Sequence, residues 1–386
     1  MSRTVLRRGM LWDGRGEASR RADLAFEDGL VAPAADAVEA AQVLDISGCT
    51  VLPGLIEGHA HLCFNAQSDW RAVYDGDGPG RMLLRMAANG RAMLEAGITT
   101  VRDLGAPTVL AIEAREAFAS GLALGPRLLV SGAPITTTGG HCHFMGGEAD
   151  GELEIRKQVR ERVKAGCDWI KVMATGGNMT PRTNTFEPQY ALAELRACVD
   201  EARRLRRRVA AHAHGAAGIA VAVEAAVDSI EHCTFSVAGE GIVPDPRVIA
   251  AMAKQGTVVS PTVSIGYRTW TDDGRRAQRA QALRDMVAAG CPMIVSTDCG
   301  IPGVPHGAIA GAMEVLAECT GLRAPEVLRM ATSGAARLLG LDDRGTLEAG
   351  RLADAVVVEG DPARDLAALS RVRYVFKAGE LVRRAG

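Results

Sequence analysis

The sequence predicts an α/β protein, a (β/α)8 (TIM) barrel that carries a small β-sandwich domain built from both ends of the chain. Two observations support this prediction. In the middle of the chain short apolar runs alternate with longer helical stretches, and at both ends short apolar runs are separated by Gly and Asp. Alternating strands and helices are typical of a parallel sheet, whereas strands separated by turn residues are typical of hairpins.

Eight candidate strands lie in the middle of the chain, and each is followed by a helical stretch. The strands are predicted at residues 55–61, 99–104, 127–131, 169–174, 209–212, 229–232, 257–260 and 293–297. The helices are predicted at residues 81–96, 108–120, 153–165, 191–205, 218–226, 247–254, 275–289 and 308–318. Eight such units favour a closed barrel over residues 55–340, although a doubly wound open sheet would show the same alternation.

The two ends of the chain resemble each other in pattern. Residues 1–54 contain short apolar runs with Asp13-Gly14 and Asp28-Gly29 as predicted hairpin turns. Residues 341–386 again contain short strands separated by Gly and Asp. The sequence therefore predicts one composite β-sandwich domain formed by residues 1–54 and 341–386.

Composition excludes several classes of protein. A net charge of −2 gives no electrostatic reason to expect nucleic acid or an anionic membrane as a partner. The nine cysteines are scattered and form no C-x-x-C pair, which favours a reducing, cytoplasmic location. The N-terminal stretch has no apolar core of a signal peptide, and no run reaches the ~18 apolar residues of a membrane span.

The predicted strand ends carry side chains that can bind metal ions. The first strand ends in His59 and His61, and their spacing of two places both imidazoles on one face. Because the carboxyl ends of barrel strands face one pocket, the other strand-borne candidates belong to the same site. These are Lys171 on the fourth strand, His212 and His214 on the fifth, Glu231 and His232 on the sixth, and Asp298 on the eighth.

Five motifs, VLPGLIEGHAHL, IKVMATGG, AHAHG, SIEHC and STDCG, resemble the metal-ligand motifs of the amidohydrolase superfamily. The segment LLGLDDRGTLEAGRLADAVVVEGDP is similar to the closing segment of that superfamily. Within it, GGHCHFMGGEADG and IKVMATGGNMTP resemble the imidazolonepropionase-like branch, which includes dipeptidases and carboxypeptidases of the prolidase and Xaa-Arg type. The resemblance covers nearly the whole chain.

The resemblance implies two zinc ions and a role for each strand-end residue. His59 and His61 would bind the first ion, His212 and His232 the second, Lys171 would be a carbamate that bridges both, and Asp298 would bind the first ion and handle protons as a catalytic residue. Chemistry accounts for this set. A lysine in a dry site near two cations loses its proton, and its neutral amine can add carbon dioxide to become an anionic ligand. Two metal ions can then hold a bridging hydroxide and polarise a carbonyl group.

Further residues are candidates for contacts with substrate. A histidine of the Gly-rich loop after the third strand contacts the substrate carbonyl in the resembling branch; His141 is favoured over His143, with loop packing as the alternative. His214 would order a ligand or bind substrate. Arg182, Tyr267 and Arg268 lie in loops where they could receive a substrate carboxylate, or be ordinary surface residues.

Two residues depart from the pattern of the resembling family. Glu57 stands where relatives commonly have Asp, which changes hydrogen bonding behind the ligands but removes no ligand. Phe235 stands where some peptidase relatives have a tyrosine whose hydroxyl could bind the substrate carboxylate. Phenylalanine has no donor, so dipeptidase specificity is the least supported part of the resemblance.

The predicted function is a binuclear, zinc-dependent hydrolase that cleaves amide bonds of N-acyl amino acid or dipeptide-like substrates through a metal-bridging hydroxide. The alternatives are a hydrolase of cyclic amides or lactones, and a non-catalytic scaffold that keeps the barrel for assembly. A small molecule is the expected substrate, with neither nucleic acid nor a membrane as partner, in the cytoplasm. A homo-oligomer is expected by analogy with relatives.

Overall fold

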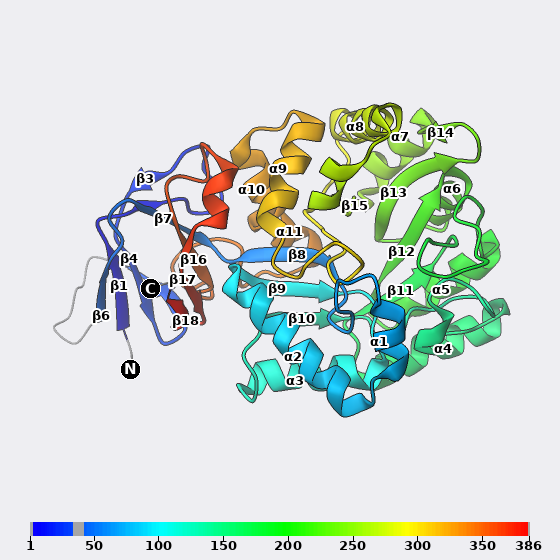
Figure 1. Ribbon diagram of the computed structural model, residues 1–386, viewed down its shortest axis with the longest axis horizontal. Helices are drawn as coiled ribbons and strands as arrows, with labels where there is room; N and C mark the ends of the chain where they lie inside the picture. The colour runs from blue at the N-terminus through cyan, green and yellow to red at the C-terminus, as the bar shows by residue number, and fades with distance from the viewer. Residues whose placement is uncertain (1–2, 34–41, 385–386) are drawn as a thin grey trace.

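The computed structural model describes residues 3–33 and 42–384. Figure 1 shows two parts: strands from both ends of the chain gather on one side, and the alternating strands and helices of the middle form the larger part. Strands β1 (Arg3–Arg7) and β18 (Glu380–Arg384) both belong to the smaller part.

Parallel strands of the middle region lie side by side in two runs. In the first run β9 (Ile98–Asp103) pairs with both β8 (Leu55–Ala60) and β10 (Arg127–Val130). The second run has the order β11, β12, β13, β15, with bounds Trp169–Met173, Arg208–Gly215, Ser229–Val237 and Val258–Ser260.

Single bridges join the two runs into a ring. Ile135, just beyond β10, pairs with Val172 of β11, and Met293 pairs with Val259 of β15. The segment that begins at Met293 also reaches β8. The backbone amide of Gly58 donates to the carbonyl of Val295, and the backbone amide of Asp298 donates to the carbonyl of His59. A series of backbone hydrogen bonds therefore starts at β8, passes through each strand of the ring in turn and returns to β8.

The prediction of a regular strand at residues 293–297 was wrong. This segment forms only isolated bridges to its neighbours. Strands β12 and β13 extend past their predicted ends, so that His214 and Phe235 lie within strands rather than after them.

Helices lie around the outside of the ring (Figure 1). They are α1 (Trp70–Gly76), α2 (Pro79–Glu95), α3 (Thr108–Ser120), α4 (Gly151–Ala165), α5 (Leu192–Arg204), α6 (Ala216–Glu224), α7 (Pro246–Gln255), α8 (Asp273–Ala288), α9 (Ile309–Thr320), α10 (Ala324–Met330) and α11 (Ser333–Leu339). Short 3-10 turns η1 (His143–Met145), η2 (Ile265–Thr269) and η3 (Leu366–Ser370) lie in connecting segments, as does the short strand β14 (Gly241–Ile242). The helices predicted from the sequence begin and end within about three residues of these bounds, the usual margin for such boundaries.

Two sheets form the smaller part, and one of them combines strands from the N-terminal and C-terminal regions. The four-stranded sheet has the order β5, β4, β1, β6, with β4 at Leu24–Glu27, β5 at Leu30–Ala32 and β6 at Gln42–Asp45. The six-stranded sheet has the order β18, β17, β16, β7, β2, β3, with bounds Val372–Lys377 for β17, Ala355–Glu359 for β16, Cys49–Pro53 for β7, Met10–Leu11 for β2 and Arg20–Arg21 for β3. Apolar side chains from both ends of the chain, among them Phe26 and Phe376, pack in one core with ring centroids 5.1 Å apart.

One predicted hairpin turn forms and the other does not. Asp28 and Gly29 both have positive φ, 50° and 83°, as a two-residue turn between antiparallel strands requires. Asp13 and Gly14 instead begin a wider loop between β2 and β3, because the Asp13 carboxylate accepts hydrogen bonds from the backbone of Arg15 and Gly16. A side chain that bonds to the following backbone stabilises a local turn without closing a hairpin.

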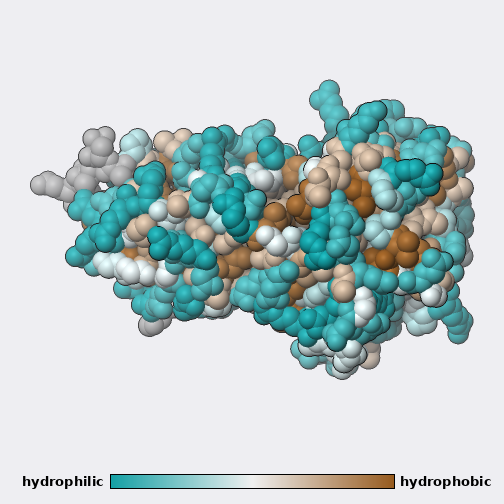
Figure 2. All heavy atoms as spheres, turned by 90° about the horizontal axis from the view of Figure 1, so that it is seen from above, coloured by the Kyte–Doolittle hydropathy of each residue, from teal (hydrophilic) through white to brown (hydrophobic). Residues whose placement is uncertain are grey.

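The largest apolar core lies between the strand ring and its helices, and polar residues cover most of the surface. Figure 2 shows a mainly hydrophilic face, with hydrophobic residues in patches toward its middle. Among the helices that the structure describes, we find none whose length and apolar character would let it cross a membrane.

Candidate active site

Two groups of metal-binding side chains lie at the carboxyl ends of the ring strands. His59, His61 and Asp298 form the first group, and His212, His214 and His232 form the second. Within each group the potential ligand atoms lie within 4.8 Å of one another. All are buried except the half-buried His214. The structure therefore brings together side chains that are up to 239 positions apart in the sequence (298 − 59).

Hydrogen bonds orient both histidines of the first group. Nδ1 of His59 lies 2.9 Å from Oε2 of Glu231, and Nδ1 of His61 lies 2.9 Å from the carbonyl oxygen of Gly105. An imidazole that donates through Nδ1 keeps its lone pair on Nε2. The two Nε2 atoms are 3.3 Å apart, so both lone pairs point to one place, as shared ligation of an ion requires.

Asp298 faces these two nitrogen atoms. Its Oδ1 is 3.4 Å from Nε2 of His59 and 3.2 Å from Nε2 of His61. Burial acts to raise the pKa of the carboxyl group, but the neighbouring imidazoles and Lys171 outweigh it and hold the pKa below its usual range. Asp298 is therefore an anion at neutral pH, which is the state that binds a cation.

The second group is also held by hydrogen bonds. Nε2 of His212 lies 3.0 Å from the carbonyl oxygen of Gly176, which leaves its Nδ1 as the acceptor. The ring centroids of His212 and His232 are 4.5 Å apart. The ring of His214 stacks on that of His232, with 4.4 Å between the centroids. Burial lowers the pKa of both His212 and His232 well below the usual value, so both are neutral, as metal binding requires.

Lys171 lies on β11 and lines the same cavity as both groups. Its Nζ is buried and has no hydrogen-bond partner among the residues that the structure describes. Burial lowers its pKa to about 8. A buried ammonium without a partner is costly, whereas a neutral amine that gains a carboxylate group would become a ligand. The donor set, with neutral imidazoles, an anionic carboxylate and this amine, fits a pair of metal ions.

A chain of buried charges lies behind His59. The carboxylate of Glu231 accepts hydrogen bonds from Nδ1 of His59, from the hydroxyl of Ser229 at 2.6 Å and from the guanidinium of Arg102 at 2.9 Å. Arg102 also donates to the carbonyl of Gly58 and lies over the ring of Trp169. Burial acts to raise the pKa of Glu231, but Arg102 and His59 hold it below its usual range. This series of hydrogen bonds fixes the tautomer of His59 that carries its hydrogen on Nδ1.

We expect the Arg102→Ala substitution to lower the free energy of unfolding by about 3–5 kcal/mol, because it leaves the Glu231 carboxylate buried without its cation. Chemical denaturation followed by circular dichroism measures the change. Arg91→Ala is the matched control, since Arg91 forms an exposed helix pair with Glu95 and should contribute less than about 1 kcal/mol. Equal effects of the two substitutions would contradict the assignment.

Glu57 connects the first strand to the segment that contains Asp298. Its carboxylate accepts from the backbone of His59 at 3.0 Å and from the backbone and hydroxyl of Thr297 at 2.9 and 2.8 Å. Burial raises its pKa to about 7. His306 lies nearby and donates to the carbonyl of His61 at 3.1 Å. Glu57 therefore has a structural hydrogen-bonding role behind the ligands.

The two loop histidines have different surroundings. His141 is buried, lines the metal cavity and has its ring 4.5 Å from that of His212. Its Nδ1 lies 3.1 Å from the hydroxyl of Thr180, and burial lowers its pKa to about 3. His143 is half-buried and lines a neighbouring cavity instead. Of the two, His141 has the position from which a side chain can reach the metal-binding groups.

The three candidates for the substrate carboxylate do not converge on one place. Tyr267 lines the metal cavity, but its hydroxyl donates to the carbonyl of Arg276 at 2.6 Å. Arg268 lies outside this cavity and pairs with Glu314 and Glu318 on α9. Arg182 lines the neighbouring cavity that contains His143. Phe235 is fully buried, so it presents no polar group to a substrate.

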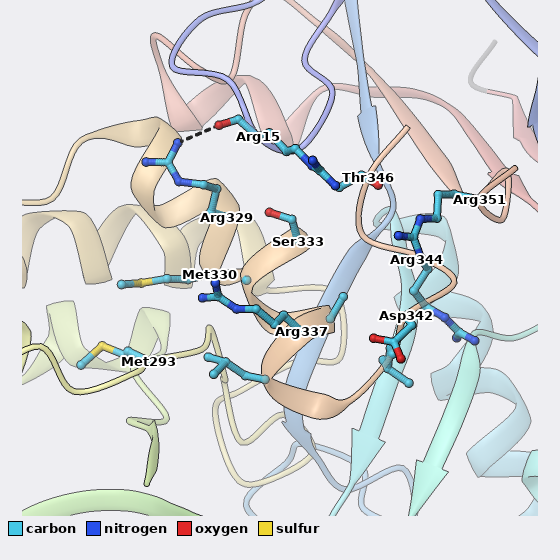
Figure 3. A pocket seen from close by; sticks show the side chains of 14 residues that line it. Arg15, Met293, Arg329, Met330, Ser333, Arg337, Asp342, Arg344, Thr346 and Arg351 are labelled. Atoms are coloured by element: carbon cyan, nitrogen blue, oxygen red, sulfur yellow. Dashed lines mark hydrogen bonds between the residues drawn. The ribbon is translucent and has the colours of Figure 1, made fainter. Parts of the chain in front are cut away.

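Three of the cavities are relevant to the choice of site. The metal cavity has a volume of about 790 Å³, and the cavity with His143 and Arg182 has a volume of about 920 Å³; they share Asn178, Met179, Ile301 and Pro302 as lining residues. A third, of about 540 Å³, lies between α10, α11 and the terminal sheets and is lined by five arginines (Figure 3). Its described lining residues include no histidine or lysine, so the metal-binding chemistry belongs to the first cavity.

Sequence reasoning missed several residues behind the ligands. It placed Glu231 at a strand end without a role and did not single out Arg102 or His306. A charged residue within the apolar stretch ITTVRDLG was the available signal for Arg102, because a charge on a buried strand needs a partner.

A ring of parallel strands with buried histidines, a lysine and an aspartate at one end is the arrangement of a metal-dependent enzyme. Comparison with known proteins supports this class. Residues 50–382 match the model of the amidohydrolase family. Ochratoxinase from Aspergillus niger is 28% identical, with 99% of this chain and 87% of that protein covered. Imidazolonepropionase from Caulobacter vibrioides is also 28% identical, with 84% of this chain and 83% of that protein covered.

A solved structure of a Xaa-Pro dipeptidase with bound methionine in its active site is similar over the full length of both chains, with a TM-score of 0.88 and 28% identity. The chain described here belongs to the amidohydrolase family. It is a hydrolase that acts on carbon–nitrogen bonds, and the superfamily predicted from the motifs is confirmed.

Proposed function

We propose that this chain is a binuclear zinc hydrolase that cleaves amide bonds in N-acyl amino acid or dipeptide-like substrates. The observation that supports two ions rather than one is Lys171. Within the described part of the chain its buried amine has no hydrogen-bond partner, and it lines the same cavity as both histidine groups. Similarity to a Xaa-Pro dipeptidase and to ochratoxinase supports an amide substrate.

In this proposal His59, His61 and Asp298 would hold one ion and His212 and His232 the other. Lys171, after adding carbon dioxide and releasing a proton, would supply a carbamate as a ligand to both. His214 packs on His232 and positions its ring. When bound, the two ions polarise the substrate carbonyl and lower the pKa of water. Asp298 takes the proton of the attacking water and passes it to the leaving nitrogen.

His141 binds the substrate carbonyl oxygen in this proposal. Burial keeps its imidazole neutral, and when Nδ1 accepts from Thr180, Nε2 carries the hydrogen. A neutral imidazole that donates a hydrogen bond can stabilise the negative charge that develops on that oxygen.

We also propose that residues 55–340 form a closed (β/α)8 barrel domain and that residues 1–54 and 341–386 form a composite β-sandwich. Residues 1–2, 34–41 and 385–386 of this second domain lie outside the described residues. The backbone hydrogen bonds around the strand ring support the first part, and the pairing of β7 with β16 supports the second. A cytoplasmic location and a homo-oligomeric state stay predictions.

We expect about two zinc ions per chain in protein purified without chelator, and loss of most activity when a chelator removes them. Because bound metal stabilises only the folded state, removal should also lower the unfolding temperature, and added zinc should restore both quantities. Metal analysis, calorimetry and hydrolysis of a panel of N-acyl amino acids, dipeptides and lactones measure these changes.

The same panel tests the alternatives. About one metal ion per chain, with activity only on cyclic or heterocyclic substrates, would contradict the bridging role of Lys171. Activity restricted to lactones or cyclic amides would favour the alternative hydrolase, and a metal-loaded protein without any activity would favour the scaffold.

A further inference from the structure

The charged side chains that line the metal cavity are few. Among the described lining residues, Asp298 is the only acidic one, and the basic ones are Lys171, Arg275 and Arg279. Since Lys171 and Asp298 belong to the metal centre in the proposed function, the two arginines are the cationic groups left for an anionic part of a substrate.

Arg279 is already satisfied by the protein. It is buried on α8, and its guanidinium donates to the carbonyl oxygens of Cys233, His232 and Pro261 at 2.8, 2.6 and 2.8 Å. Those bonds tie α8 to the strand that contains His232. Arg279 therefore has a structural role.

Arg275 is different. It lies in the first turn of α8 on the wall of the metal cavity, and its backbone amide is capped by Asp272 at 2.9 Å. Within the described part of the chain its guanidinium forms no ion pair and no side-chain hydrogen bond. The guanidinium carbon lies 5.5 Å from the ring centroid of Trp270, which also lines the cavity.

The other side chains considered for a substrate carboxylate have partners, face elsewhere or lack a donor. The hydroxyl of Tyr267 is bound to a backbone carbonyl, Arg268 pairs with two glutamates outside the cavity, and Phe235 has no donor. Among the described residues of the metal cavity, Arg275 is thus the cationic side chain whose N–H groups are available to bind a substrate anion.

We propose that Arg275 binds a free carboxylate of the substrate. This inference rests on the proposed function and narrows its substrate class to N-acyl amino acids and dipeptides with a free carboxylate, as opposed to their esters, carboxamides or lactones. A guanidinium presents two parallel N–H groups to a carboxylate, and the ring of Trp270 favours a fixed orientation of the side chain.

The test compares a substrate acid with its own carboxamide in the zinc-loaded protein. For the best acid of the panel, we expect Arg275→Ala to lower kcat/KM about 10- to 100-fold, mainly through KM, because a hydrogen-bonded ion pair is lost. For the carboxamide we expect a change of less than about twofold. Arg275→Lys should retain part of the preference for the acid.

Arg276→Ala is the matched control, because Arg276 is the next residue on α8 but lines a different cavity with Arg268. It should leave the preference unchanged. Equal losses for acid and carboxamide in Arg275→Ala, or no loss for either, would overturn the assignment of Arg275.

A binding measurement separates this inference from the proposed function. Calorimetry of the same acid and carboxamide with the Asp298→Asn protein measures binding without turnover. If the double variant Asp298→Asn/Arg275→Ala binds the acid more weakly than Asp298→Asn does, while binding of the carboxamide is unchanged, the inference is supported. This holds even if the wild-type protein cleaves no amide, in which case only the proposed function fails. Unchanged binding of the acid overturns the inference.

Discussion

Lys171→Ala should lower kcat/KM by about 10³-fold or more, because Lewis-acid stabilisation of the transition state contributes several kcal/mol and the bridge between the ions would be absent. Metal analysis of the same protein should give fewer than two zinc ions per chain. The substitution removes a buried amine that has no hydrogen-bond partner among the described residues, so no hydrogen bond is lost and the free energy of unfolding of the metal-free protein should not fall on that account.

Lys157→Ala is the matched control for this prediction. Lys157 is an exposed lysine that faces Glu161 on α4, so its loss should change neither activity nor metal content. Short carboxylates such as formate or acetate, added at high concentration, should partly restore activity to Lys171→Ala, since they can occupy the space of the carbamate. Full activity in Lys171→Ala without additive would contradict the bridging role.

Asp298→Asn should lower kcat by about 10²- to 10⁴-fold, the range typical of a lost general acid–base group. Asparagine has nearly the same shape but cannot accept a proton from the attacking water. Steady-state kinetics at saturating substrate measure the change, and circular dichroism verifies that the fold is kept. Asp273→Asn is the control, because the Asp273 carboxylate is almost fully exposed at the start of α8. A kcat within tenfold of wild type would exclude Asp298 from proton transfer.

Much of the fold could be predicted because its signals are local. The alternation of apolar runs and helical stretches located α3 at residues 108–120 without error, and Asp28-Gly29 marked a two-residue turn. The segment 293–297 has the same apolar character as a strand, but whether it pairs regularly depends on neighbours that are distant in sequence. Asp13-Gly14 resembled a hairpin turn because the sequence does not show that the Asp13 side chain bonds to its own loop.

The ligands could be predicted better than the residues that support them. His59 and His61 are recognisable from their spacing, whereas Arg102 and Glu231 are 129 positions apart and form a pair only through the pairing of distant strands. In the loop after β15 no periodicity indicates which side chain faces the cavity. The sequence therefore offered Arg268 beside Arg182 and Tyr267 as candidates for the substrate carboxylate, whereas the structure places Arg275 on the cavity wall.

The antiparallel pairing of β7 with β16 has a consequence for how the chain acquires its fold. Cys49 pairs with Glu359 and Pro53 with Ala355, so the support for the first strand of the ring comes from residues about 300 positions later. Contacts of such high sequence separation slow folding, because a very long loop must close before they form. During synthesis, β8 with His59 and the adjacent His61 would lack the neighbouring sheet until nearly the whole chain has left the ribosome. Slow, late assembly of the metal site is therefore expected during refolding from denaturant.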